Sequence, residues 1–241
     1  MEEWIEDARL GTIRFRRNAR ARRIVFRPSQ DGLTATVPLF ATRFHVEQAV
    51  ERLRDRLERV QRQHNDDRWE IIPSYCIENE HFEYRAIAVE RPAPALRNTP
   101  KGLVCEYPPT LDFGNREFQR WLLRHIQDRM TLLARDVLVP RLHELAAGRG
   151  LQFAQVRIRK ARRQLGSCNS RKHISLNPYL LLLPRHLQDF VMHHELTHLL
   201  ELNHSPRFYA LLDKAVDGKA DRYRKELKST RIQLMYCSAA E

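Results

Sequence analysis

Five consecutive residues in the C-terminal third of the chain, His194-Glu195-Leu196-Thr197-His198, carry the side chains best suited to chemistry. Two histidines four residues apart lie on the same face of a helix, so both imidazoles can bind one metal ion. Glu195 is rotated by about 100° from His194 around the helix axis, so it can act on water in the open position rather than ligate the ion. The pattern therefore indicates a zinc site with Glu195 as general base.

A catalytic zinc site takes three ligands from the protein and keeps one position open to water. His204 is the expected third ligand, because Asn203 tolerates the left-handed conformation that ends a helix. Ser205-Pro206 then has the residue types of the cap and first position of another helix. A helix, a reversal at Asn203 and a new helix would return His204 to the first two histidines. Three acids further along the chain are rival third ligands: Asp213, Asp217 and Asp221.

This motif is a specific signal for a chain of this composition. The chain has 11 histidines among 241 residues. Composition alone then gives an expected count on the order of 0.04 for two histidines and a glutamate at this spacing. The alternative interpretation is a helix with incidental histidines, some of them hydrogen-bonded in the core.

The elements around the motif must bring these side chains together. The motif is expected on a helix that begins at Pro184 and reaches about Leu202. Before it, Asn177 followed by Pro178 has the residue types of an N-cap and first helical position. A strand, a turn-rich stretch and a second short strand are expected upstream, in this order: Phe153–Arg159, Gly166–Ser170 and Ile174–Leu176.

The N-terminal part is expected to be rich in strands. Within residues 11–37, Ile13 and Phe15 alternate with basic residues, and Asp31-Gly32 supplies a turn before a further strand. Thr42 then caps a helix. Its apolar residues recur at a three-four spacing that puts them on one face: Val46, Ala49, Val50, Leu53, Leu57 and Val60.

A long amphipathic helix is expected in the middle of the chain, from about Arg116 towards Leu138. Pro140 would interrupt or kink it, because proline lacks the backbone N–H that the helix requires. Gly148 is a suitable terminator, since glycine adopts the left-handed conformation at helix ends.

These patterns predict an α+β fold. Phe82–Val89 indicates another strand, whereas residues 91–109 contain five prolines and are expected to be mostly loop, with a short strand at Leu103–Tyr107. We expect a β-rich part with one amphipathic helix over residues 1–110, packed against a mainly helical part over residues 111–241. The two parts are expected to form one integrated unit.

Basic residues exceed acidic residues by 42 to 30, which gives a formal charge of +12. The excess gathers in two stretches that contain no acid: residues 8–30, with eight arginines, and residues 145–188, with nine basic residues. Dense positive charge attracts polyanions, so nucleic acid or phosphorylated substrates are candidate partners. The alternative is a solvated, arginine-rich surface, because no stacking aromatic residues or recognised nucleic-acid fold accompany the charge.

Cysteine usage and the N-terminus bear on the compartment. Four widely spaced cysteines form no CxxC pair, which favours reduced thiols over a cysteine-zinc site or a disulfide framework: Cys76, Cys105, Cys168 and Cys237. The chain begins with acidic residues where a secretory signal would be basic and then apolar. Its longest aliphatic run, Leu180–Leu183, is too short to span a bilayer. We therefore expect a cytoplasmic protein that does not associate with a membrane.

Residues from about 150 to 216 resemble the YgjP-like metallopeptidase family, a branch of the zincins. The matching segments are Leu165-Gly-Ser-Cys-Asn-Ser-Arg, Ile174-Ser-Leu-Asn-Pro, the aliphatic run ending at Pro184, His194-Glu-Leu-Thr-His and Asn203-His-Ser-Pro-Arg-Phe-Tyr. The arginine-rich N-terminal segment and the long middle helix also fit the family plan. The family usually has tryptophan in place of Leu165 and of Tyr209, and both look like packing positions. The ligand spacing equals that of metzincins, but Glu201 occupies their turn glycine.

The resemblance implies a zincin-like fold and a peptide or protein substrate. It also implies the roles of four site residues: His194, His198 and His204 as zinc ligands and Glu195 as the catalytic residue. The family has a strand beside the active-site helix, so Gly166–Ser170 and Ile174–Leu176 would line the cleft. In zincins, such an edge strand can pair with an extended peptide.

Several neighbours of the motif have two interpretations. Cys168 is either a small packed thiol or a residue that contacts metal or substrate. His193 points about 100° away from His194 and could pair with Asp189, four residues earlier. The basic segment Arg171-Lys172-His173 either faces a negatively charged substrate or lies in a solvated loop.

Three functions are compatible with these residues. The first is a zinc metallopeptidase, in which water activated by Glu195 attacks a peptide carbonyl. The second is a zinc hydrolase of phosphoanhydrides such as nucleoside triphosphates, which the basic surroundings would favour. The third is a nucleic-acid-associated protease whose activity is localised by polyanion binding, an idea that rests on analogy.

Overall fold

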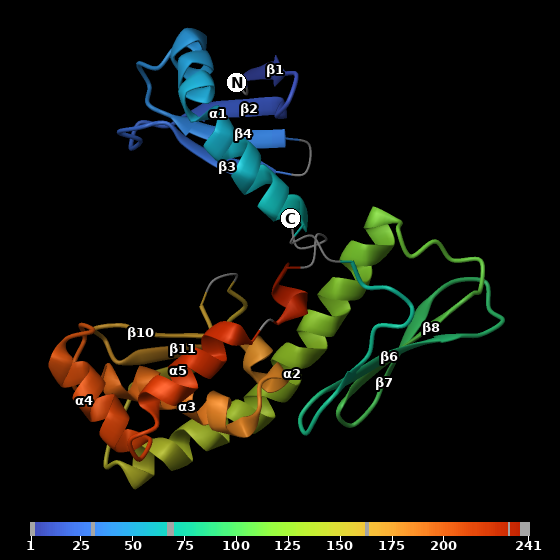
Figure 1. Ribbon diagram of the computed structural model, residues 1–241. Coiled ribbons are helices and arrows are strands. Elements are labelled where there is room, and N and C mark those ends of the chain that lie inside the picture. Colours follow the sequence, from blue (N-terminus) through green and yellow to red (C-terminus); the bar gives the residue numbers. More distant parts are fainter. Residues whose placement is uncertain (1–2, 30–31, 67–69, 162–163, 231, 237–241) are drawn as a thin grey trace. The chain divides into compact units, whose positions relative to one another are not determined.

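The computed structural model describes residues 3–29, 32–66, 70–161, 164–230 and 232–236 (Figure 1). Contacts divide the chain into two compact units, Met1–Trp69 and Glu70–Glu241. Strands and helices occur in both units, so the expected α+β class is confirmed. No helix in the described residues has the length and apolar character needed to cross a membrane.

The first unit is a four-stranded sheet with one helix. Its elements are β1 (Glu3–Asp7), β2 (Gly11–Arg17), β3 (Val25–Ser29), β4 (Gly32–Val37) and α1 (Arg43–Asp66). The strand order is β1-β2-β4-β3. β2 runs parallel to β4 and antiparallel to β1, while β3 runs antiparallel to β4. The short strands expected in this part are confirmed, and β1 is an additional strand that the pattern did not predict.

One face of this sheet is covered by α1. Ile13 and Phe15 point into the core from β2, where they pack with Val46 and Val50 of the helix. The alternation of apolar and basic residues thus separates a buried face from an exposed one. The three-four spacing of the helix is also confirmed, except that Val60 is exposed. Asp31, where a turn was expected, lies outside the described residues.

The second unit begins with another four-stranded sheet. Its strands are β5 (Ile77–Glu78), β6 (Glu83–Ala88), β7 (Ala95–Asn98) and β8 (Gly102–Tyr107), in the order β5-β6-β8-β7. The strands expected near Phe82–Val89 and Leu103–Tyr107 are confirmed, while β7 lies in a stretch that was expected to be loop. Arg129 of the following helix donates hydrogen bonds to the carbonyl groups of Gly102 and Thr99. The sheet therefore packs with the helical part, whereas the sequence pattern grouped residues up to 110 with the N-terminal strands.

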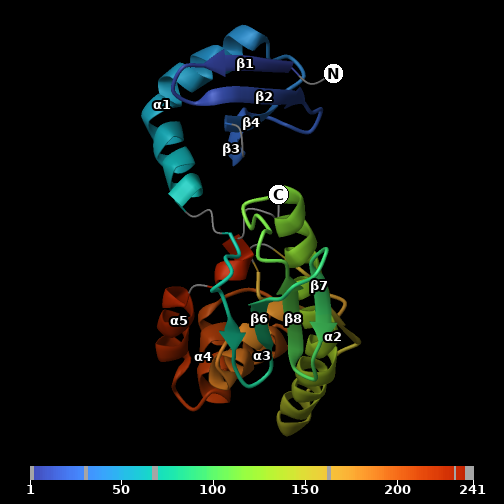
Figure 2. The same ribbon diagram turned by 90° about the vertical axis from the view of Figure 1, so that its right-hand side faces the viewer.

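The long helix α2 (Arg116–Gly148) organises this unit. It lies between the β5–β8 sheet and the C-terminal helices (Figures 1 and 2). Asn115 caps it by accepting hydrogen bonds from the N–H groups of Glu117 and Phe118. A row of buried residues at helical spacing holds α2 in the core: Ile126, Met130, Ala134, Leu138, Leu142 and Ala146.

Two expectations for this helix are corrected. The helix continues through Pro140, so the expected interruption does not occur. Pro140 is exposed, so the carbonyl group that loses its N–H partner can bond to water, while Leu138 and Leu142 on the buried side keep their packing. The helix does end at Gly148, but the left-handed conformation of a terminator belongs to Gly150, at φ 63°.

The remaining strands form a small sheet beside the C-terminal helices. β9 (Gln155–Ile158), β10 (Gly166–Cys168) and β11 (His173–Leu176) have the order β10-β11-β9. The two expected strands are confirmed as β9 and β11. Gly166–Ser170 was expected to be a turn, but its first three residues form β10, which pairs antiparallel with β11. A turn signal from small residues does not reveal that a neighbouring strand offers backbone partners.

Short helices complete the unit: η1 (Pro178–Leu182), α3 (Arg185–Thr197), α4 (Pro206–Ala215), α5 (Ala220–Ser229) and η2 (Gln233–Tyr236). The expected cap at Asn177 is confirmed, since its side chain accepts a hydrogen bond from the N–H of Tyr179. Phe190 of α3 packs with Phe208 and Leu212 of α4. This core fixes α3 against α4, and the histidine motif lies where they meet.

Candidate metal centre

Three histidines converge at the C-terminal end of α3. His194 lies in the last turn of the helix and His198 is its C-cap residue, while His204 lies just before α4. Their ring centroids are 4.8 to 5.0 Å apart in every pairing. One ligand atom from each ring lies within 4.8 Å of the other two. Among the described residues, His194, His198 and His204 thus form a group of side chains that could together hold one metal ion.

The chain reaches His204 by a different route from the one expected. α3 ends at Thr197 rather than near Leu202, and turn hydrogen bonds follow, including one from the Glu201 N–H to the Thr197 carbonyl. Asn203 does not adopt the left-handed conformation. Instead, the Ser205 N–H bonds to the Asn203 carbonyl at 2.8 Å, which makes a three-residue turn centred on His204. The helix ends earlier because the chain must turn back within six residues of His198.

The expected second helix begins as predicted. The Ser205 hydroxyl accepts a hydrogen bond from the Phe208 N–H at 3.3 Å, and Pro206 is the first residue of α4. This cap places Phe208 beneath the histidines, where it is fully buried. Its ring centroid lies 4.6 to 4.9 Å from those of all three histidines. Phe208 thus forms an apolar floor that restricts the imidazole orientations.

Burial and hydrogen bonding keep the first two imidazoles in the form that binds metal. Burial, together with the smaller effect of the neighbouring His198 and His204, lowers the pKa of His194 to about 4. Burial also lowers the pKa of His198. Nδ1 of His198 lies 3.2 Å from the Glu201 carbonyl oxygen, to which it can donate. A proton on Nδ1 leaves the Nε2 lone pair of a neutral ring free for an ion.

The Glu195 carboxylate lies in an apolar, enclosed position. The residue is only 4% exposed, and Oε2 has no hydrogen-bond partner among the described residues. Burial raises the pKa of this carboxyl group to about 8. An unpartnered buried carboxylate is costly unless a water, ion or substrate completes its environment. This orphaned oxygen therefore indicates a water, ion or substrate group beside Glu195.

Gly166 at the start of β10 makes room for that carboxylate. A Cβ atom built on Gly166 would lie 2.5 Å from Oε1 of Glu195 and 2.7 Å from its Cγ. Any larger side chain would therefore displace the carboxylate or the strand. The sequence pattern placed Gly166 along the cleft, but only the structure shows why this position requires glycine.

Arg149 anchors the end of the motif helix and was not singled out from the sequence. Its guanidinium donates to the His193 carbonyl and to the Thr197 hydroxyl oxygen, both at 3.2 Å. A cation there satisfies the carbonyl end of the helix and opposes its dipole. The expected pairing of His193 with Asp189 is wrong, because the Asp189 carboxylate receives two hydrogen bonds from Arg141, at 2.9 and 2.7 Å.

The strand β10 brings Cys168 near the site. Its thiol is half-buried, and burial together with the nearby Glu195 charge raises its pKa to about 11. The thiol is therefore protonated at neutral pH, and it does not belong to the group of ligand atoms formed by the three histidines. Arg171 and Lys172 are exposed in the turn between β10 and β11, where the backbone of Lys172 is left-handed at φ 58°.

The rival acids have other roles. The Asp213 carboxylate accepts a hydrogen bond from the Ala220 N–H at 3.1 Å, which joins α4 to α5. Asp221 pairs with Arg224, and Asp217 is exposed at φ 54°. None of them belongs to the group of ligand atoms that includes His204.

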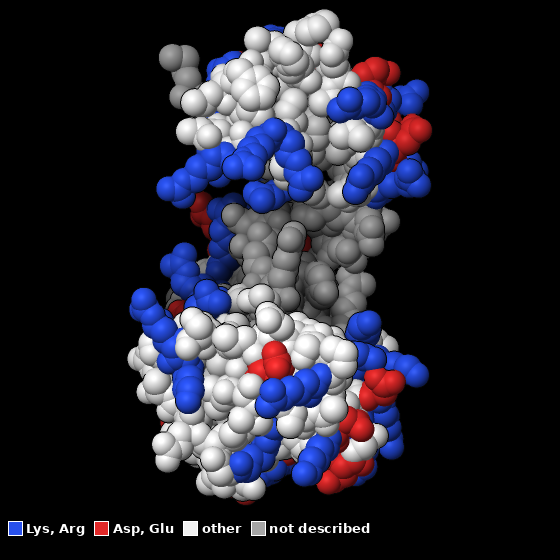
Figure 3. All heavy atoms as spheres, turned by 90° about the vertical axis from the view of Figure 1, so that its left-hand side faces the viewer, with Lys and Arg blue, Asp and Glu red and all other residues white. Residues whose placement is uncertain are grey.

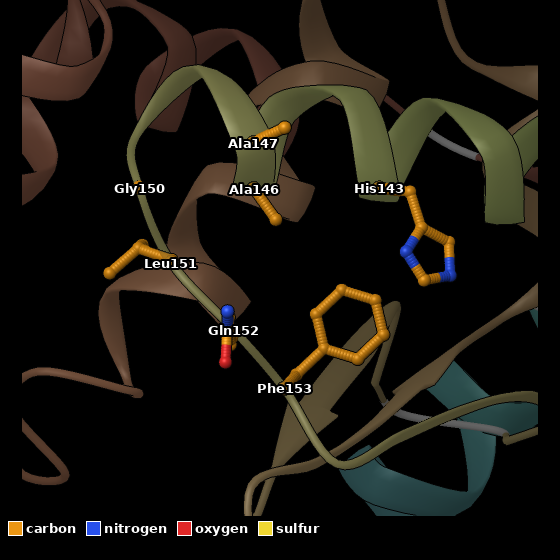
Figure 4. Close-up of a pocket in the computed structure, with 7 residues that line it drawn as sticks. All are labelled: His143, Ala146, Ala147, Gly150, Leu151, Gln152 and Phe153. Carbon is orange, nitrogen blue, oxygen red and sulfur yellow. The ribbon is translucent and has the colours of Figure 1, made fainter.

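Cavities lined by described residues occur elsewhere in this unit. A cavity of about 420 Å³ follows the end of α2, where the His143 and Phe153 rings face one another at 4.7 Å (Figure 4). Its lining is His143, Ala146, Ala147, Gly150, Leu151, Gln152 and Phe153. A second, of about 510 Å³, lies between the β7–β8 hairpin and α2, beside Trp121 and Leu132. The three histidines line neither of them.

The donor set fits a zinc ion. Three neutral imidazoles are a ligand set that zinc accepts in catalytic sites, which keep one position open. Carboxylate-preferring ions such as Mg²⁺ and Ca²⁺ would find only nitrogen donors in this group. Glu195 follows His194 directly in the sequence, and its buried carboxylate keeps one oxygen without a partner among the described residues.

Comparison with known proteins agrees with these features. A model of the YgjP-like metallopeptidase domain matches residues 22–230. A search of curated proteins gives no match. Among solved structures, the crystal structure of the metallopeptidase zymogen of Pyrococcus abyssi abylysin is 23% identical and covers 40% of this chain and 100% of that chain, with a TM-score of 0.33. A TM-score of this size is too low to establish a shared fold.

Proposed function

Because this chain belongs to the YgjP-like metallopeptidase domain family, we propose that it is a zinc-dependent peptidase. His194, His198 and His204 hold the ion, and Glu195 is the general base. The observation that carries this proposal is the convergence of three imidazoles, with ligand atoms within 4.8 Å of one another. The residue next to His194 in the sequence adds a buried carboxylate oxygen that lacks a partner in the described residues.

A zinc ion held by the three imidazoles supplies a Lewis acid that polarises a peptide carbonyl and acidifies water. The protein supplies the base. Glu195 takes the proton of the attacking water, a role open to a carboxylate whose Oε2 has no hydrogen-bond partner among the described residues. The same group can then deliver the proton to the amine nitrogen of the product.

An extended peptide is the substrate shape that the surroundings support. In the described part of the chain, β10 pairs with β11 alone, so its other edge presents unpaired backbone groups. A peptide strand could add to such an edge through main-chain hydrogen bonds. Gly166 on this strand lies against Glu195, so a peptide aligned there would pass close to the base. This arrangement favours an extended peptide segment, rather than the surface of a folded protein, as the substrate.

A phosphoanhydride hydrolase is the second candidate. Arg171 and Lys172 are exposed in the turn that follows β10, and cations on this turn would favour an anionic substrate such as a nucleoside triphosphate. The same metal and base could then direct water at phosphorus. The peptidase remains the primary proposal because the matched family is described as a metallopeptidase domain.

One pair of proteins tests both the base and the substrate class. Zinc-loaded wild type and Glu195→Gln are incubated with casein and, separately, with the four nucleoside triphosphates. We expect casein cleavage by the wild type and a loss of at least about 100-fold in the variant, with equal zinc content. Hydrolysis of triphosphates but not casein would select the second candidate. Equal turnover by both proteins would remove Glu195 from the mechanism.

A further inference from the structure

The face of the β1–β4 sheet that α1 does not cover carries an unexpected row of side chains. Trp4 pairs in register with Arg14, Arg14 with Thr34, and Thr34 with Arg27, so these four residues cross the sheet side by side. All four are exposed, and Trp4 is 62% exposed. We call this row together with Arg16, which follows on the same face of β2, the arginine face. An exposed tryptophan at the end of this row, beside Arg14, is not required by the core of this unit.

Several arginines of this region form no ion pair in the described part of the chain. Among the described residues, Arg16, Arg27 and the loop arginines between β2 and β3 form no ion pair; those in the loop are Arg20, Arg22 and Arg23. Arg17 pairs with Glu3, and Glu6 accepts a hydrogen bond from the Thr12 hydroxyl. Figure 3 shows a band of basic side chains without acidic neighbours on this unit, whereas acidic groups are interspersed at one side.

More exposed aromatic surface adjoins the arginine-rich loop. The Asn18 N–H bonds to the Val37 carbonyl and Arg17 Nε to the Ala41 carbonyl, so the segments after β2 and after β4 lie side by side. Phe40, in the second segment, is 76% exposed. The sequence pattern offered no stacking aromatics near the arginines, because Trp4 and Phe40 come beside them only in the folded unit.

We propose that the arginine face binds single-stranded nucleic acid, independently of the metal centre. The indole of Trp4 can stack on a base, while guanidinium groups contact phosphates and can themselves stack. Three strand spacings separate Trp4 from Arg27, a span of roughly 14 Å. A four-stranded sheet with exposed aromatics accommodates two or three bases in other RNA-binding folds.

The chemistry favours this partner over other polyanionic ones. All basic residues in the stretch 8–30 are arginine rather than lysine, and arginine is the side chain that recognises phosphate bidentately and stacks on planar groups. A flat sheet face cannot enter the major groove of duplex DNA as a helix does. Duplex and anionic membrane are therefore the competitors that an experiment must separate.

Fluorescence anisotropy with the full chain provides the test. The probes are a labelled ten-nucleotide oligo-U and oligo-dT, the same length of duplex DNA, and vesicles of phosphatidylserine and phosphatidylcholine. The variants are Trp4→Ala and the double variant Arg16→Gln/Arg27→Gln. The matched control is Arg52→Gln/Arg56→Gln, which removes the same charge from exposed positions of α1, on the other side of the sheet. Circular dichroism checks that each variant is folded.

We expect single strands to bind more tightly than duplex or vesicles. Trp4→Ala should weaken binding between about fivefold and about 100-fold. The arginine-face double variant should reduce the slope of log Kd against log salt by about 1.4, since each phosphate contact contributes about 0.7, whereas the control should change little. The two single-stranded probes identify the preferred sugar. Equal losses in both double variants, an unchanged Trp4→Ala, preference for duplex or vesicles, or no binding at low salt would each overturn the proposal.

Discussion

Gly166→Ala is the substitution that most sharply probes the position of the base. The added Cβ would lie 2.5 Å from Oε1, 2.7 Å from Cγ and 2.9 Å from Cδ of Glu195. Ordinary contacts between such atoms require roughly 3.5 Å, so the carboxylate must move by about 1 Å. A displacement of that size at a catalytic group can cost about 100-fold in rate. Overpacking adds a stability loss of about 1 to 3 kcal/mol.

The assay is kcat and KM for a peptide that the wild type cleaves, with zinc content and urea unfolding measured on the same preparations. We expect kcat to fall about 100-fold with zinc retained. Gly148→Ala is the matched control, because a Cβ there meets nothing within 4 Å and alanine suits a helix. In a Glu195→Gln background, Gly166→Ala should cause little further decrease in kcat. Full activity in Gly166→Ala, or loss of zinc along with activity, would refute the placement of the carboxylate.

Three further predictions concern the framework of the protein. Arg149→Met should lower the free energy of unfolding by about 2 kcal/mol, since two charged hydrogen bonds to the end of α3 are lost; a change below about 0.5 kcal/mol in urea unfolding would argue against this anchor. Burial would raise the pKa of Asp7, but hydrogen bonds from the backbone of Arg9 and Leu10 and from Arg54 hold it below its usual value of 3.8. The stabilisation from Asp7 is therefore present above that value and lost as the pH falls through the folded pKa. In Asp7→Asn, the hydrogen-exchange protection of β1 and β2 should therefore depend less on pH in the acid range; the same pH dependence as in the wild type would contradict this prediction. Cys76 is exposed, whereas burial raises the pKa of Cys105 to about 11, so iodoacetamide at pH 8 should modify Cys76 much faster in peptide maps; equal rates would refute the burial of Cys105.

The grouping of the site residues could be predicted from the sequence, because it depends on spacings within a short segment of the chain. Two histidines four apart must share a helical face, and Ser205-Pro206 must start a helix that returns the chain. The path between them could not be predicted, since several turns span the same residues. The structure uses a three-residue turn at His204 rather than a left-handed Asn203.

The supports of the site were less visible because they come from distant segments. Arg149 contacts α3 from the end of α2. Gly166 contacts Glu195 from β10, a strand whose small residues led to the prediction of a turn. Contacts across the fold decide both positions, and a single sequence does not report such contacts. The same is true of Trp4 and Arg27, which become neighbours on one face only through the strand order of the sheet.

X-ray absorption at the zinc K-edge of the purified full chain tests the central claim most directly. We predict one zinc per chain, with three imidazole nitrogens and one oxygen at about 2.0 to 2.1 Å. His204→Ala should reduce the imidazole contribution by one ring. A sulfur scatterer at about 2.3 Å, or a protein that is fully active without metal, would contradict the convergence of His194, His198 and His204 on one ion.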